Sequence, residues 1–77
     1  MSDTEPILDV RGLPCAVRRA TIFEMFDLLQ DGRALQIVND HDPGGLRRHF
    51  ETHAPGCYDW AYLVAGPEEW RVRITRV

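Results

Sequence analysis

The order of the predicted elements, β-α-β-α-β-β, places this chain in the α+β class as an α/β two-layer sandwich: a four-stranded mixed sheet with two helices on one face. Three observations predict this fold. Apolar residues recur at helical spacing in residues 15–29 and, more sparsely, in residues 43–53. A short apolar run suited to a strand precedes each of these segments. Residues 58–64 and 70–75 each alternate between two kinds of side chain, which is typical of hairpin strands.

The connections predict how the strands are arranged. A strand–helix–strand unit crosses over right-handedly and makes its two strands parallel, and the closing hairpin adds an antiparallel pair. Two helices can cover only one face of a four-stranded sheet. We therefore expect the opposite face to be open to solvent and to carry Arg71, Arg73 and Thr75.

The first strand and helix have the clearest pattern. Residues 7–10 form the apolar strand, and Gly12 and Pro14 mark the turn that follows. The helix is expected to end at Asp31, with Gly32 in the left-handed conformation that often closes a helix. The stripe expected to face the sheet consists of Ile22, Met25, Phe26 and Leu29.

The second half of the chain supplies a buried strand, a weaker helix and the hairpin. Residues 34–38 are nearly all apolar, as in a strand flanked by neighbours. Asp42 before Pro43 is a helix-start signal, because aspartate accepts hydrogen bonds at the N-cap and proline suits the first helical position. Core packing against the helices is the expected role of four aromatic residues: Tyr58, Trp60, Tyr62 and Trp70.

Composition limits the classes of function. The 77 residues suffice for one domain, which we place at residues 7–77 after a disordered tail at residues 1–6. A net charge of −3 argues against a general nucleic-acid binder, and no segment approaches the length of a membrane span. Two cysteines and no signal-like apolar run predict a cytoplasmic protein with reduced thiols. No cofactor is expected.

Cys15 is the first candidate for a reactive residue, because it lies at the start of the helix that follows the first strand. The free N–H groups and positive dipole end of a helix favour a thiolate, as do the nearby cations of Arg11, Arg18 and Arg19. This pattern predicts a nucleophilic thiol with arginines placed to bind a partner. The alternative is a partly buried cysteine that acts as a small apolar group.

The loop at residues 39–42 is expected beside Cys15, since the carboxyl ends of the first two strands share one edge of the sheet. His41 is a candidate base toward Cys15, and Asp40 is a candidate partner-binding residue. The alternative is that these polar side chains only support the turn and the start of the next helix.

His49, His53 and Cys57 are spaced by four and four, which suggests a metal site at the opposite end of the molecule. Against this, no fourth ligand is apparent, and histidines at this spacing also suit the edge of the core. A disulfide between Cys15 and Cys57 is not expected, because the two thiols would begin at opposite ends of the sheet.

The first third of the chain resembles the TusA/SirA family of small sulfur carriers. The resemblance lies in residues 8–13 (LDVRGL), the cysteine that opens the helix, and the β-α-β-α-β-β order. In that family this cysteine carries a persulfide between partner proteins. The Cys-Pro-X-Pro signature of the family reads Cys15-Ala16-Val17-Arg18 here, without its prolines.

A broader resemblance covers residues 7–76. It is to a bacterial domain of unknown function that is related to TusA/SirA and often accompanies hemerythrin-like or cupin-like domains. The segments that carry it are residues 8–14, 22–24, 38–43 and 66–74. Two hypotheses follow: a sulfur carrier that accepts sulfane sulfur on Cys15 from a partner such as a cysteine desulfurase, or a non-catalytic module that binds a redox or hemerythrin-like protein.

Overall fold

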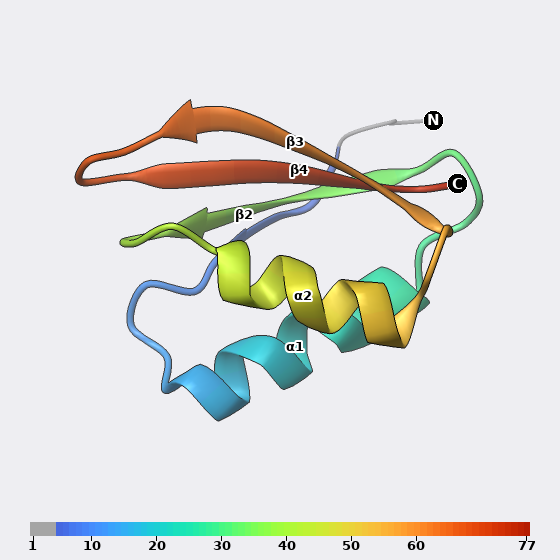
Figure 1. The fold of residues 1–77 in the computed structure, drawn as a ribbon, viewed down its shortest axis with the longest axis horizontal. Helices are drawn as coiled ribbons and strands as arrows, with labels where there is room; N and C mark the ends of the chain where they lie inside the picture. The colour runs from blue at the N-terminus through green and yellow to red at the C-terminus, as the bar shows by residue number, and fades with distance from the viewer. Residues whose placement is uncertain (1–4) are drawn as a thin grey trace.

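The chain adopts the predicted β-α-β-α-β-β order (Figure 1). The computed structural model describes residues 5–77. Its elements are β1 (Ile7–Asp9), α1 (Cys15–Asp27), β2 (Ala34–Asn39), α2 (Gly44–His53), β3 (Tyr58–Ala65) and β4 (Trp70–Arg76). The fold class is therefore confirmed as a two-layer α+β sandwich with a four-stranded mixed sheet.

The strand order in the sheet is β1-β2-β4-β3. β1 runs parallel to β2, and β4 is antiparallel to both β2 and β3. Three strands therefore point the same way, and their carboxyl ends share one edge of the sheet. That edge brings together the loop after β1, the loop after β2 and the β3–β4 turn, while both helices lie on one face (Figure 1).

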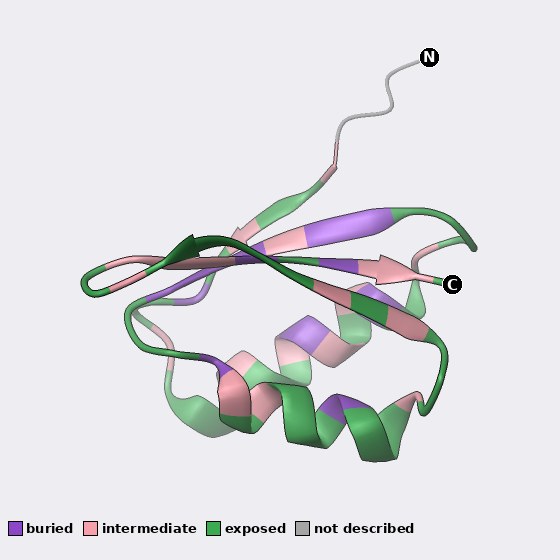
Figure 2. Cartoon of the chain, turned by 45° about the horizontal axis from the view of Figure 1, so that its top comes forward, coloured by how far each residue is buried: buried purple, intermediate pink, exposed green. Residues whose placement is uncertain are grey.

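The core lies between the sheet and the helices, where the buried residues of both layers face each other (Figure 2). Ile22 and Phe26 of α1 are buried, as the helical spacing predicts. Phe50 is the buried residue of α2, and its ring meets Phe26 edge-on with centroids 5.0 Å apart. Burying side chains of this size contributes about 1.5–3 kcal/mol each, so these few residues dominate the stability of a small domain.

The aromatic residues of the hairpin divide between core and surface. Tyr58 and Trp60 pack against the core beside Phe50, as predicted. Tyr62 is 41% exposed, because β3 has a bulge at residues 62–64 and extends beyond the start of α2. Trp70 is half-buried and lies over Gly66 in the hairpin turn. Core packing is therefore the role of only part of this aromatic set.

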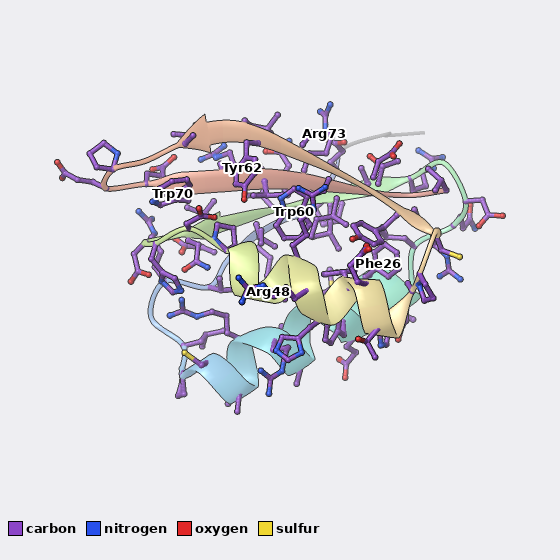
Figure 3. All side chains as sticks on the ribbon, viewed as in Figure 1. Phe26, Arg48, Trp60, Tyr62, Trp70 and Arg73 are labelled. Carbon is purple, nitrogen blue, oxygen red and sulfur yellow. The ribbon has the colours of Figure 1, made fainter. Side chains whose placement is uncertain are left out.

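The outer face of the sheet carries polar side chains, among them Arg73, while Phe26 and Trp60 lie between the layers (Figure 3). Glu5 accepts hydrogen bonds on this outer face from Gln36 at 2.8 Å and from Arg73 at 2.7 Å. The carbonyl of Pro6 accepts the backbone N–H of Gln36. Glu5 and Pro6 are thus fixed to the sheet, which shortens the predicted tail; residues 1–4 lie outside the described residues.

Two predicted helix ends differ in the structure. α1 stops at Asp27, four residues before the predicted end at Asp31, because Leu28 and Leu29 donate to carbonyls three residues back and so tighten the last turn. Gly32 does have a positive φ of 85°, but it lies in the turn beyond the helix. These changes leave the apolar face of α1 unaltered.

The predicted N-cap of α2 is also wrong. The helix begins at Gly44 after Pro43, and no side chain within the described residues caps it. Asp42 is therefore one residue too early to reach the free N–H groups. Its Oδ1 instead accepts a hydrogen bond of 3.0 Å from the Tyr62 hydroxyl, which links the loop after β2 to β3.

Candidate functional site

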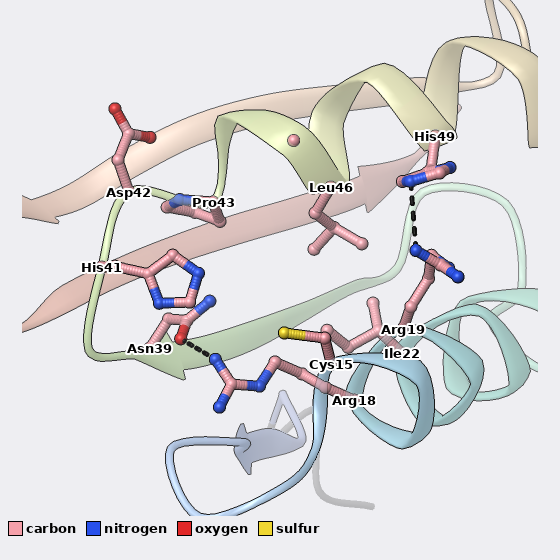
Figure 4. Close-up of a pocket in the computed structure, with 11 residues that line it drawn as sticks. Cys15, Arg18, Arg19, Ile22, Asn39, His41, Asp42, Pro43, Leu46 and His49 are labelled. Atoms are coloured by element: carbon pink, nitrogen blue, oxygen red, sulfur yellow. Dashed lines mark hydrogen bonds between the residues drawn. The ribbon is translucent and has the colours of Figure 1, made fainter.

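A pocket of about 300 Å³ lies where the first turns of α1 and α2 meet the carboxyl end of β2 (Figure 4). The half-buried Leu46 supplies apolar surface inside it, and the buried Ile22 lies behind the wall. The polar groups that matter for chemistry are Cys15, Arg19, Asn39, His41 and His49. With Arg18, which also lines it, the pocket combines a thiol, two imidazoles and two guanidiniums at the edge of the sheet where the sequence placed a site.

Cys15 is the first residue of α1 and is exposed. Its sulfur points into the pocket (Figure 4). The residue before it, Pro14, has no side-chain acceptor, and the first bond of the helix runs from the N–H of Arg18 to the Pro14 carbonyl. No side chain among residues 5–77 therefore caps the first-turn N–H groups of α1. These N–H groups and the positive end of the helix dipole can stabilise a negative charge near the Cys15 sulfur.

His41 and Asp40 form a hydrogen-bonded pair beside this thiol. Nδ1 of His41 lies 2.7 Å from Oδ1 of Asp40. Because a carboxylate only accepts, Nδ1 carries a proton, and Nε2 lies on the pocket side of the ring (Figure 4). The hydrogen bond from His41 lowers the pKa of Asp40, which keeps it ionised. His41 and Cys15 line the same pocket, and within residues 5–77 no hydrogen bond joins the imidazole to the thiol.

Arg18 has a positioning role. It donates to the Leu13 carbonyl at 2.8 Å and to Oδ1 of Asn39 at 2.6 Å, with its side chain only 13% exposed. It thereby ties the loop before α1 to the end of β2. Nη1 of Arg18 also forms an ion pair with Oδ1 of Asp40, which lies 3.6 Å away.

Arg11 and Arg19 differ in where their charges lie. Arg11 is paired with Asp9 at 2.7 Å, and the hydrogen bonds from Arg11 lower the pKa of Asp9 to about 2. Arg19 lines the pocket, where its Nη1 donates to Nε2 of His49 across 3.2 Å. Of the three arginines near Cys15 in sequence, Arg19 is therefore the one that brings its cation to the pocket without a carboxylate partner among residues 5–77.

The histidines of α2 do not lie together at the far end, as the sequence suggested. His49 faces α1 and lines the Cys15 pocket. His53 stacks on Phe23 with centroids 4.4 Å apart and lies 2.8 Å from Asp27. Cys57 is an exposed free thiol between α2 and β3. Throughout residues 5–77, no three His, Cys, Asp or Glu side chains are close enough to hold a metal ion.

Asn39 belongs to the loop that the sequence placed near Cys15, but its contact with Arg18 was not predicted. It is only 3% exposed at the end of β2, and its Oδ1 accepts hydrogen bonds from Arg18 and from the backbone N–H of Asp40. The signal in the sequence is a polar amide that directly follows the apolar run of a buried strand. An amide at that position needs partners, and one of them here comes from α1.

Fold and site together define a small two-layer α+β domain with a thiol-containing pocket at the carboxyl edge of its sheet. Residues 7–76 match the model of the family described as uncharacterized conserved protein DUF2249, and the chain belongs to this family. The predicted membership of a domain family of unknown function is thereby confirmed.

The fold also occurs in a solved structure, the solution structure of HP1264 from Helicobacter pylori. The two share 11% sequence identity at a TM-score of 0.72, over 91% of this chain and 95% of that one. The likeness concerns the fold. A search of curated proteins finds no match to the chain. Neither helix within residues 5–77 is long and apolar enough to cross a membrane.

Proposed function

We propose that this protein is a cytoplasmic sulfur carrier that holds sulfane sulfur on Cys15. The observation that carries the proposal is the direction of the exposed Cys15 sulfur, which points into a pocket that His41 also lines, with Nδ1 of His41 hydrogen-bonded to Asp40 (Figure 4). The resemblance of the first strand and helix to TusA/SirA carriers supports the same role. A carrier needs an accessible thiol that a second protein can reach, and this one lies at the surface.

The transfer is an exchange between two sulfur atoms. His41 accepts the thiol proton at Nε2, and the Cys15 thiolate attacks the outer sulfur of a partner's persulfide. The S–S bond of the partner breaks, its inner sulfur leaves as a thiolate, and Cys15 becomes the persulfide. No external oxidant or reductant is needed. Asp40 stabilises the imidazolium that forms, and the first turn of α1 favours the anionic sulfur.

The donor in this proposal is a protein persulfide such as that of a cysteine desulfurase. Arg11 and Asp40 lie at the surface near the pocket, and both are exposed. They are suited to contact the donor, whereas Arg18 holds the loop that presents Cys15. Arg19 adds a cation to the wall of the same pocket.

The direct test incubates the purified protein with a cysteine desulfurase and cysteine, followed by intact mass measurement. We expect a mass increase of one sulfur atom that is removed by reductant. The increase should be lost in Cys15→Ser and retained in Cys57→Ser, the matched control with the other exposed thiol. A wild-type protein that gains no sulfur, or gains it equally in Cys15→Ser, would overturn the proposal.

A second candidate function is a non-catalytic module that binds a redox or hemerythrin-like protein. The observation that favours it is the outer sheet face, where Ile7, Leu63 and Val64 are exposed beside Arg71 and Arg73. Binding through this face would survive Cys15→Ser. Titration of a hemerythrin-like domain with the wild type and with Cys15→Ser separates the two functions. A binding module should show the same affinity for that domain in the wild type and in Cys15→Ser.

A further inference from the structure

We propose that the Cys15 pocket contains a binding site for a small organic anion, whose carboxylate or sulfonate head is held by the side-chain amide of Asn39, while the cation of Arg19 on the other side of the pocket adds electrostatic attraction. The site does not depend on sulfur transfer, because neither group needs the thiol to react. The apolar body of the ligand would rest on Leu46, which is half-buried in the pocket wall.

The buried amide of Asn39 is the first argument. Asn39 is 3% exposed, and within residues 5–77 its side chain makes hydrogen bonds through Oδ1 alone. Two donors, the Arg18 guanidinium and the N–H of Asp40, hold that oxygen and so fix which way the amide faces. Nδ2 therefore points into the pocket with two hydrogen atoms and no protein acceptor (Figure 4). Donors placed this way call for an acceptor from outside the chain.

The charges around the pocket favour an anion as that acceptor. α1 and α2 both begin at the pocket, and neither has a side-chain cap or an acidic residue in its first turn within the described chain. Arg19 adds a guanidinium that is hydrogen-bonded only to the His49 ring among the described residues. Both helix dipoles and the cation therefore act on the same space.

The acidic groups nearby are already engaged. Asp40 is paired with His41 and lies 3.6 Å from Arg18. Asp42 lines the pocket, but its Oδ1 accepts from the Tyr62 hydroxyl and its carboxylate points away from the other lining residues (Figure 4). Neither carboxylate occupies the donors of Asn39.

Size and lining select the kind of anion. A volume of about 300 Å³ exceeds what a bare inorganic ion needs and lies at the lower end of small-molecule sites. The half-buried side chain of Leu46 offers apolar surface to the rest of the ligand. A short organic acid can both accept hydrogen bonds from the Asn39 amide and pack against Leu46. Sulfate or phosphate can only accept the hydrogen bonds.

The test is an NMR titration of the isotope-labelled full chain with butyrate, acetate and sulfate in separate arms. We expect butyrate to shift the Asn39 side-chain amide signals together with the backbone amides of Cys15 and Gly45, with a higher affinity than acetate. Equal affinity for acetate and butyrate, or tighter binding of sulfate, would overturn the assignment to an organic acid. No shift of the Asn39 amide signals with any anion would overturn the site itself.

Variants separate this site from the thiol. Asn39→Asp keeps an oxygen for Arg18 but replaces the donors with a negative charge, so butyrate binding should weaken by about tenfold or more. Arg19→Gln should weaken it as well, whereas the matched control Arg48→Gln, on the exposed side of α2, should not. Cys15→Ser should keep butyrate binding while losing sulfur transfer. If Arg48→Gln weakens butyrate binding as much as Arg19→Gln, the loss of affinity comes from the lower net charge of the protein, and the site is refuted.

Discussion

Nη1 of Arg18 donates to Oδ1 of Asn39 across 2.6 Å, although the two residues are 21 positions apart in sequence. The bond joins the first turns of α1 to the end of β2. It sets the distance between the loop that carries Cys15 and the loop that carries His41. The geometry of the pocket therefore rests on a buried polar contact as well as on the apolar core.

Replacing Arg18 with glutamine should destabilise the protein. The change removes a charge-assisted hydrogen bond to Asn39 and leaves the Leu13 carbonyl without its guanidinium donor. We expect the free energy of unfolding to fall by about 2 kcal/mol in urea denaturation. Arg48→Gln, at an exposed position, should change it by about 0.5 kcal/mol or less. Equal effects of the two variants would refute the positioning role.

Replacing Gly66 with alanine should destabilise the hairpin. Gly66 has a φ of 56°, and a Cβ there would lie 2.5 Å from the Trp70 ring. We expect a loss of about 1–3 kcal/mol in thermal or urea unfolding, from the strained backbone and the overlap together. Gly12→Ala is the matched control, since a Cβ at Gly12 meets nothing within 4 Å. In a Trp70→Leu background the cost of Gly66→Ala should shrink, and an unchanged cost would show that the ring is not responsible.

Cys15 should react with iodoacetamide faster than Cys57 at neutral pH. Both thiols are exposed, so access alone does not distinguish them, but only Cys15 begins a helix and lines a pocket together with His41. Peptide mass mapping over time should give a rate ratio of about tenfold. Asp40→Asn should reduce the ratio, because His41 loses the carboxylate that orients its ring. Equal rates for the two cysteines would mean that the pocket does not activate the thiol.

The ion pair between Asp9 and Arg11 at the end of β1 should make the free energy of unfolding depend on pH in the acid range. The hydrogen bonds from Arg11 lower the pKa of Asp9 from 3.8 to about 2, so Asp9 binds its proton more weakly in the folded chain than in the unfolded one. Its contribution is fully present above pH 3.8 and is lost as the pH falls through about 2. The unfolding free energies of wild type and Asp9→Asn should therefore converge over this range. A constant difference between pH 5 and about pH 2 would contradict the shifted pKa.

Periodicity and topology rules account for most of the fold. Helical spacing identifies Ile22 and Phe26 as core residues, since a residue's place on a helix face follows from its position in sequence. The direction of parallel strands puts Cys15 and the loop of residues 39–42 at one edge of the sheet. Both arguments need only local pattern and the handedness of connections.

Contacts that depend on how helices are placed could not be predicted in this way. The sequence assigns Asp42 to a helix cap, but its partner is Tyr62, 20 residues away on a neighbouring segment. His49 was expected at the far end, yet α2 is packed so that it meets Arg19 of α1. The role of Asn39 likewise depends on the reach of Arg18. Sequence spacing does not determine such distances between elements.

The most direct measurement of the central claim is to locate the sulfur after the protein has been loaded by a cysteine desulfurase. Trapping with iodoacetamide, followed by peptide mapping, should find the persulfide on the Cys15 peptide and not on the Cys57 peptide, and the loading rate should fall in His41→Ala. Sulfur distributed equally between the two exposed cysteines, at a rate that His41→Ala leaves unchanged, would contradict the account.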